Sequence, residues 1–138
     1  MDNYEKFVEE NTKLNETYLE LFKKDLTDKG LSEKTIKNHM SNAELYINDY
    51  LTYYEIIPAL HGWKSVGMFF GYWFIRKALW ASPDNIKSTA SSVKKFYKCM
   101  LENNLIEASN YEYVDYVIKE QMEYWIEDYL NLYGEKGE

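Results

Sequence analysis

The residues best suited to binding chemistry lie between Asn85 and Lys98, a stretch with four lysines, four serine or threonine hydroxyls and no acid. On a helix, spacings of three and four residues bring part of this set to one side, opposite an apolar stripe that includes Ile86 and Val93. A row of ammonium and hydroxyl groups can follow a phosphate backbone. The residues on that side are Lys87, Ser91, Lys94, Lys95 and Lys98. An ordinary solvated surface is the alternative interpretation.

A smaller polar cluster precedes Ile36, where a helix is expected to begin. Ser32 stands where an N-cap is needed, because its hydroxyl can accept a hydrogen bond from a free backbone amide of the next turn. Lys34, Thr35 and Lys37 follow in the first turns. The free amides and the dipole of a helix N-terminus favour anions, so these residues form a second candidate anion-binding segment.

The sequence offers no constellation for catalysis or metal binding. Its two histidines, His39 and His61, are interpreted as a partly buried helix residue and a loop residue, and they are too far apart to form a cluster. Cys99 is the only cysteine. Neighbouring lysines could lower its pKa, but inert packing is the expected role. We therefore expect a protein that is not an enzyme and that has no cofactor and no metal ion.

The elements that must position these residues are helices. Apolar residues make up 46% of 138 residues, prolines and glycines are few, and apolar positions recur at intervals of three and four. These features predict an all-α bundle of about five helices in a single domain, 1–138. The expected helices cover 4–28 (with a possible break at 11–15), 32–54, 63–80 as the central helix, 83–103 and 110–133.

Apolar spacing also predicts which helix faces are buried. The first helix should bury Leu14, Tyr18, Leu21, Phe22 and Leu26. The fourth should bury Ile86, Ala90, Val93, Phe96, Tyr97 and Met100, and the last should bury Val114, Val117, Ile118, Trp125, Ile126, Tyr129 and Leu130.

Charge is distributed unevenly along the chain. The net charge is −7. Residues 31–105 carry nine Lys/Arg against six Asp/Glu, whereas residues 106–138 carry two against nine. Phosphate-binding surfaces normally leave a basic footprint, so the middle of the chain is where one is expected. The single cysteine fits a reducing compartment, no run approaches the ~20 apolar residues needed to span a bilayer, and we expect a cytoplasmic protein without membrane contact.

Several segments together resemble a known family. The runs LFKKDL at 21–26, GLSEKTI at 30–36 and YINDYL at 46–51, followed by KKFYK at 94–98 and LENNLI at 101–106, are similar to the N-terminal core-binding (SAM-like) domain of phage integrases and tyrosine recombinases. The resemblance covers about 15–107 and implies a compact helical bundle that clamps duplex DNA. It implies DNA contacts from Ser32, Lys34, Thr35, Lys37, Lys87, Ser88, Ser91, Lys94, Lys95 and Lys98.

The chain departs from that family in two respects. We expect no catalytic domain of that family here, because a sequence whose only arginine is Arg76 cannot supply the paired arginines of the family's active site. The acidic, tyrosine-rich segment 108–138 stands where the family would lead into catalysis. We therefore expect a non-catalytic module that binds double-stranded DNA. The alternative is a module of the same fold that uses its tyrosines to bind a protein partner or to form a homodimer.

The acidic last helix also suggests a link between these features. If that helix folds back over the lysines, its carboxylates compete with phosphate and act as an internal brake. Deleting the chain from Ser109 onward should then strengthen DNA binding.

Overall fold

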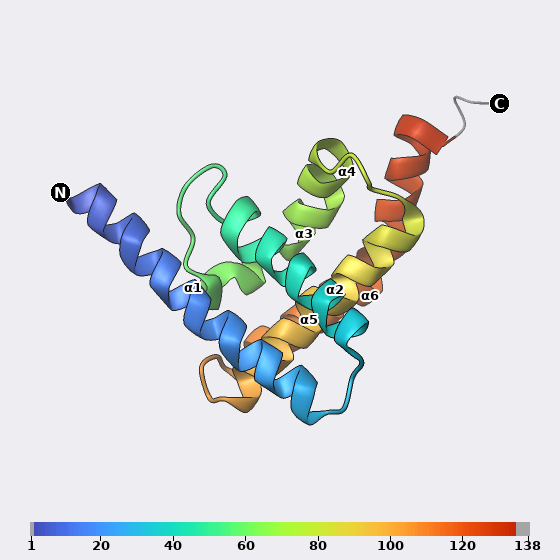
Figure 1. Ribbon diagram of the computed structural model, residues 1–138. Coiled ribbons are helices and arrows are strands. Elements are labelled where there is room, and N and C mark those ends of the chain that lie inside the picture. The colour runs from blue at the N-terminus through green and yellow to red at the C-terminus, as the bar shows by residue number, and fades with distance from the viewer. Residues whose placement is uncertain (1, 135–138) are drawn as a thin grey trace.

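The computed structural model describes residues 2–134, and within them it is an all-α bundle (Figure 1). The helices are α1 (Asn3–Asp28), α2 (Glu33–Glu44), α3 (Val66–Met68), α4 (Phe74–Lys77), α5 (Pro83–Glu102) and α6 (Ala108–Tyr129). Three π-helical segments extend or connect them: η1 (Leu45–Tyr50), η3 (Phe69–Trp73) and η4 (Leu130–Gly134). A 3-10 helix, η2 (Ala59–Ser65), precedes α3. The expected all-α fold class is confirmed.

Helix α5 is the element on which the others pack, because it contacts α1, α2 and α6. Ser82 caps it by accepting a hydrogen bond from the Asn85 amide at 3.1 Å, and Pro83 occupies its first turn, where a missing N–H costs nothing. The predicted apolar stripe is confirmed, since all six of its residues are buried. The opposite side of α5 is therefore fixed toward solvent.

Helix α1 differs from the prediction in two ways. It continues through 11–15 without a break, and Leu14 is 49% exposed whereas Leu19 is buried. The reason is that Asn11 and Asn15 occupy the buried face. The Nδ2 of Asn15 donates to the carbonyl oxygen of Ile47 at 3.3 Å, so this polar side chain satisfies a backbone group of the π-helical turn beside it.

The second and third predicted helices are shorter than expected. Helical structure after Ser32 ends with η1 at Tyr50 and not at 54, and the aromatic segment is helical only to Lys77. Phe69, Phe70 and Phe74 are fully buried in the segment formed by α3, η3 and α4. Leu79 lies in the loop before α5 and is 98% exposed, so the predicted helix 63–80 was too long at its end, and α5 takes the central position.

Helix α6 is part of the core despite its acidity. Val114, Val117 and Trp125 are buried, and the Trp125 ring stacks on Phe70 with 5.0 Å between ring centroids. Ile118 and Tyr129 are partly buried, whereas Leu130 is exposed, which corrects its predicted place in the buried stripe. Between residues 2 and 134, no helix combines the length and the apolarity that crossing a membrane requires.

Candidate nucleic-acid interface

The solvent side of α5 carries the predicted lysines. Five of the six candidate residues on this helix are exposed, and Lys94 is partly buried. We call this set the α5 basic face; it consists of Lys87, Ser88, Ser91, Lys94, Lys95 and Lys98. Because the stripe on the other side of α5 is anchored in the core, these side chains have a fixed direction relative to the bundle.

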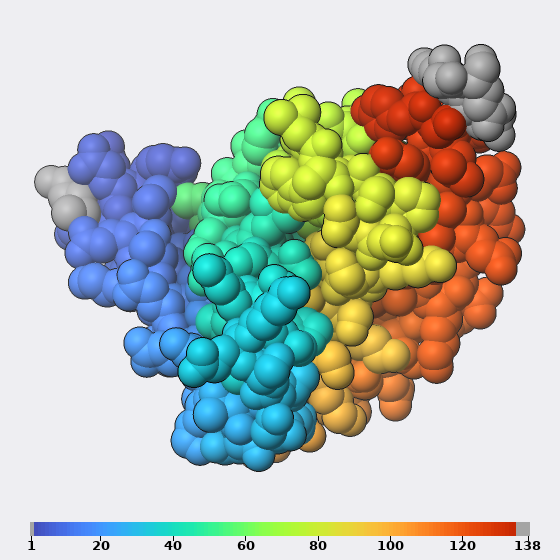
Figure 2. All heavy atoms as spheres, turned by 45° about the vertical axis from the view of Figure 1, so that its right-hand side comes forward, coloured from blue at the N-terminus to red at the C-terminus, as the bar shows by residue number. Residues whose placement is uncertain are grey.

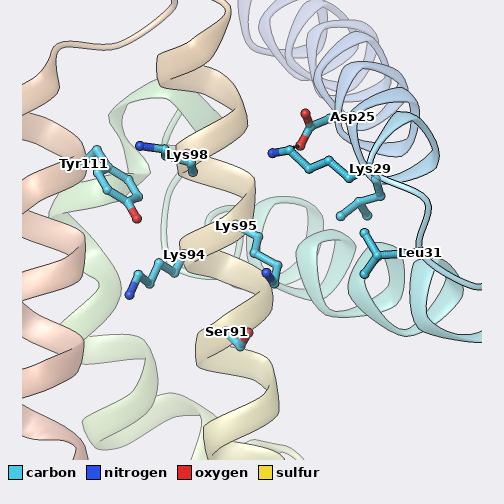
Figure 3. Close-up of a pocket in the computed structure, with 9 residues that line it drawn as sticks. Asp25, Lys29, Leu31, Ser91, Lys94, Lys95, Lys98 and Tyr111 are labelled. Atoms are coloured by element: carbon cyan, nitrogen blue, oxygen red, sulfur yellow. Dashed lines mark hydrogen bonds and ion pairs between the residues drawn. The ribbon is translucent and has the colours of Figure 1, made fainter.

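A pocket of about 240 Å³ lies where the C-terminal part of α5 meets α1 and α6 (Figure 3). We call it the lysine pocket; its lining residues are Asp25, Leu26, Lys29, Leu31, Ser91, Lys94, Lys95, Lys98 and Tyr111. Lys94 and Lys98 extend from α5 toward the side where Tyr111 lies, and Lys29 and Leu31 lie on the opposite side (Figure 3). Four of the nine lining residues are lysines, and one, Asp25, is a carboxylate.

The α6 side of the pocket supplies a carboxylate. Asp115 Oδ1 lies 2.6 Å from Lys94 Nζ, and Asp115 Oδ2 lies 3.0 Å from Lys119 Nζ. The hydrogen bonds from Lys94 and Lys119 lower the pKa of Asp115, and the bond to Asp115 raises the pKa of Lys94. Both groups are charged at neutral pH. The expectation that an acidic residue of the last helix pairs with the lysines therefore holds at one position, Lys94.

Two other lysines of the pocket have different surroundings. Lys98 Nζ lies 5.0 Å from the centroid of the Tyr111 ring, a cation–π distance. Lys29 Nζ lies 3.0 Å from Asp25 Oδ2 and 3.4 Å from Glu102 Oε1, and the hydrogen bond to Asp25 is the main cause of its raised pKa. No local pattern in the sequence marks Lys29, because it contacts α5 only through tertiary packing.

Helix α2 meets the N-terminal half of α5 along a second hollow, of about 350 Å³, which we call the α2–α5 groove. Figure 2 shows α2, in cyan, beside the yellow atoms of α5. Thr35 and Ser88, from the two predicted segments, both line this groove. None of the lining residues is a carboxylate, and all but Trp80 have polar side chains. The other lining residues are Asn38, His39, Ser41, Asn42, Trp80, Asn85, Thr89 and Ser92.

The remaining residues of the first segment do not join this groove. Ser32 caps α2, accepting from the Thr35 amide at 3.2 Å, and its hydroxyl also donates to Thr35 Oγ1 at 3.0 Å. Lys37 lines a different, largely apolar hollow between α1 and α2, together with Ile36 and Met40. Lys34 is exposed and lines neither the groove nor the lysine pocket. The structure thus brings Thr35 to α5 but leaves Lys34 and Lys37 apart from the α5 lysines.

His39 lines the α2–α5 groove and is in contact with α5. Its Nδ1 lies 2.7 Å from Ser92 Oγ. Burial, and then the positive charge of Lys95, lower the pKa of His39. The imidazole is therefore neutral at pH 7, as expected for a partly buried helix residue.

The other groups considered for chemistry are structural. Cys99 is buried, and burial raises the pKa of its thiol to about 11, so the thiol is inert packing as expected. Among residues 2–134, no three His, Cys, Asp or Glu side chains are grouped so that they could hold a metal ion. The candidate duplex interface therefore consists of the α5 basic face and the α2–α5 groove, and the lysine pocket adjoins it.

Comparison with known proteins adds no relative. No family model matches the chain, and neither the curated proteins nor the solved structures that were compared with it include a significant match.

Proposed function

We propose that the chain is a non-catalytic module that binds double-stranded DNA through the α5 basic face and the adjoining face of α2. The observation that carries the proposal is that Thr35 and Ser88 line one groove, beside which the α5 lysines lie. Ammonium groups that neutralise phosphates, next to hydroxyls and amides that can hydrogen-bond them, are what backbone contact requires. The resemblance to the core-binding (SAM-like) domain of integrases points to Thr35 and the α5 basic face among its implied DNA contacts.

The charges limit the expected affinity. In the described part of the chain, no carboxylate lies within 4 Å of the ammonium groups of Lys87, Lys95 and Lys98, whereas Lys94 is paired with Asp115. Three phosphate contacts give a slope of log K against log salt of about −2.7, or roughly a 40-fold loss of affinity between 50 and 200 mM salt. The net charge of −7 weakens binding further. Binding should therefore be weak and steeply dependent on salt.

The test is fluorescence anisotropy of a labelled duplex of ~25 base pairs, titrated at 50 and 200 mM salt. The test variant replaces Lys95 and Lys98 by Gln. The control replaces Lys6 and Lys13 by Gln, which changes the net charge equally on the N-terminal half of α1, outside the candidate interface. We expect the test variant alone to lose about two units of the salt slope. Equal effects of both variants, or no wild-type binding at 50 mM salt, would contradict the proposal.

A protein-binding module is the second candidate, and exposed tyrosines on α6 favour it. Tyr116 and Tyr124 are 63% and 62% exposed, and Tyr113 is 43% exposed. Tyrosine is common at interfaces because its ring buries apolar area while its hydroxyl keeps a hydrogen-bond partner. If no DNA binds at low salt, light scattering provides the test of this second function. A molar mass that increases with protein concentration in the wild type, but not in Tyr116→Ser and Tyr124→Ser, would support a homodimer.

A further inference from the structure

The lysine pocket differs from the candidate duplex interface because it is recessed and bounded by three helices. Part of the α5 basic face lines the pocket, together with the end of α1 and the start of α6 (Figure 3). We infer that the lysine pocket binds a phosphomonoester group, which is a phosphate attached through one ester bond only. This inference rests on lysines of the proposed function, but it also depends on Lys29 and Tyr111, which the proposed function does not use.

The free lysines of the pocket suit a phosphomonoester better than a backbone phosphate. The lining holds four lysines and the Asp25 carboxylate, and the carboxylates of Asp115 and Glu102 also contact Lys94 and Lys29. In the described part of the chain, Lys95 and Lys98 are the two lysines of the pocket with no carboxylate within 4 Å. A phosphomonoester carries about −1.5 to −2 charges at neutral pH, because its second pKa is ~6, whereas a phosphodiester carries one charge. Two of the lysines, Lys29 and Lys94, are already held in place by ion pairs, so binding orders fewer side chains.

The pocket also offers neutral donors over an apolar floor. Ser91 and Tyr111 both line it and each carries a hydroxyl, and Tyr111 lies on the side toward which Lys94 extends (Figure 3). Leu26 is 2% exposed, and together with Leu31 it forms apolar wall. Charge-assisted hydrogen bonds strengthen where apolar groups displace water, since the local dielectric constant falls.

Size restricts the ligand to a compact group. Pockets for drug-sized molecules measure about 300–1,000 Å³. The lysine pocket, at about 240 Å³, is below that range and suits a phosphate with part of its ester. A phosphate inside a duplex is flanked by a sugar on both sides, whereas a terminal phosphate is attached on one side and can enter a recess. The 5′ end of a DNA strand and a free nucleoside monophosphate both present this group.

Phosphate can replace Asp115 as the partner of Lys94. It competes with phosphate for Lys94, but it also has Lys119 at 3.0 Å. When phosphate takes Lys94, the Asp115 carboxylate keeps one cationic partner, so no unpaired charge is left at the pocket's edge.

The experiment compares two duplexes that differ only in a 5′-phosphate or a 5′-hydroxyl, with the label at a 3′ end. We expect the 5′-phosphorylated duplex to bind about 10-fold more tightly, since one added charge meets several ammonium groups. Lys29→Gln and Tyr111→Phe should reduce this preference and leave the affinity for the 5′-hydroxyl duplex unchanged. Lys6→Gln is the matched control and should change neither.

Amide chemical shifts on addition of inorganic phosphate, and then AMP, separate the possible results. Shifts at Ser91 and Tyr111 with phosphate, in a chain that binds no 5′-hydroxyl duplex, would overturn the proposed DNA function and support the phosphate site. Equal affinity for both duplexes with no shifts would overturn the phosphate site and leave the DNA function standing. If AMP binds at least as tightly as inorganic phosphate, a free nucleotide is sufficient as the ligand. If only the 5′-phosphorylated duplex binds more tightly than its 5′-hydroxyl counterpart, the ligand is a DNA end.

Discussion

Replacing Asp115 by Asn should strengthen DNA binding, although Asp115 touches no DNA in the proposed arrangement. Its carboxylate lies 2.6 Å from Lys94 Nζ and occupies the ammonium group that a phosphate would use. The substitution keeps the size of the side chain and removes the charge. Because the pair is partly exposed and Lys94 remains solvated, the free energy of unfolding should fall by less than about 1 kcal/mol.

The size of the gain follows from the geometry. A phosphate that contacts Lys94 from the open side lies about 6 Å from the Asp115 carboxylate. This distance is the sum of the ion-pair distance and a typical ammonium–phosphate contact. Two unit charges at ~6 Å repel by about 0.7 kcal/mol in water and about 2.8 kcal/mol at an effective dielectric constant of 20. Without this repulsion, the affinity should increase by roughly 3-fold to 100-fold. The slope of log K against log salt should also steepen by the amount expected for about one additional phosphate contact.

The assay is the anisotropy titration at 50 and 200 mM salt, and Asp128→Asn is the control. Asp128 lies 13 residues farther along the helical run that contains Asp115, or about 20 Å away, and the change in net charge is identical. Charges that far apart are screened, because the Debye length is ~10 Å at 0.1 M salt. An equal gain in both variants would show that only net charge matters, and a loss of affinity in a folded Asp115→Asn protein would refute the reasoning.

Three further predictions concern buried polar and titratable groups. Asn15→Ala should lower the free energy of unfolding by about 1–3 kcal/mol in urea denaturation, because the Ile47 carbonyl loses its side-chain donor, whereas Asn48→Ala should cost less. At pH 8 the native Cys99 thiol should react with a disulfide reagent about 100-fold more slowly than in the urea-unfolded chain, since its pKa is about 11. The pKa of His39 is lowered in the folded state, so on acidification the unfolded chain binds the proton first. The free energy of unfolding should therefore be greatest above pH ~6.5 and should fall toward pH 5. This decline should be smaller in His39→Gln. Equal rates for native and unfolded Cys99, or identical pH profiles for both proteins, would contradict the last two.

Local patterns predicted α5 well because its determinants are local. The Ser82 cap, Pro83 and a stripe at three-and-four spacing all lie within the helix or next to it. The prediction for α1 was wrong about Leu14 because apolar spacing cannot recognise a buried asparagine. Asn15 is buried on account of the Ile47 carbonyl, 32 residues away, and nothing near Asn15 in the sequence signals a π-helical turn there.

In the candidate interface, too, the local features were predicted and those that depend on tertiary packing were not. The α5 lysines were found because one helix presents them, but the pocket they line also needs Lys29 from α1 and Tyr111 from α6, which come near α5 only in the folded chain. The first segment was predicted as a unit, yet consecutive helical positions point in different directions. Thr35 therefore lines the α2–α5 groove, and Lys37, two residues later, lines the hollow beside α1.

The structure also changes how the acidic helix can be tested. Deleting the chain from Ser109 would remove the competing carboxylates, but it would also remove Val114, Val117 and Trp125 from the core and expose Phe70. Losing three large buried side chains costs several kcal/mol, which is comparable to the whole stability of a small domain. A truncated chain that fails to bind DNA would thus reveal nothing about a brake. The proposed brake acts through the ion pair between Asp115 and Lys94. Substitutions that remove the Asp115 charge and keep the helix can therefore decide whether α6 opposes the proposed binding of phosphate to α5.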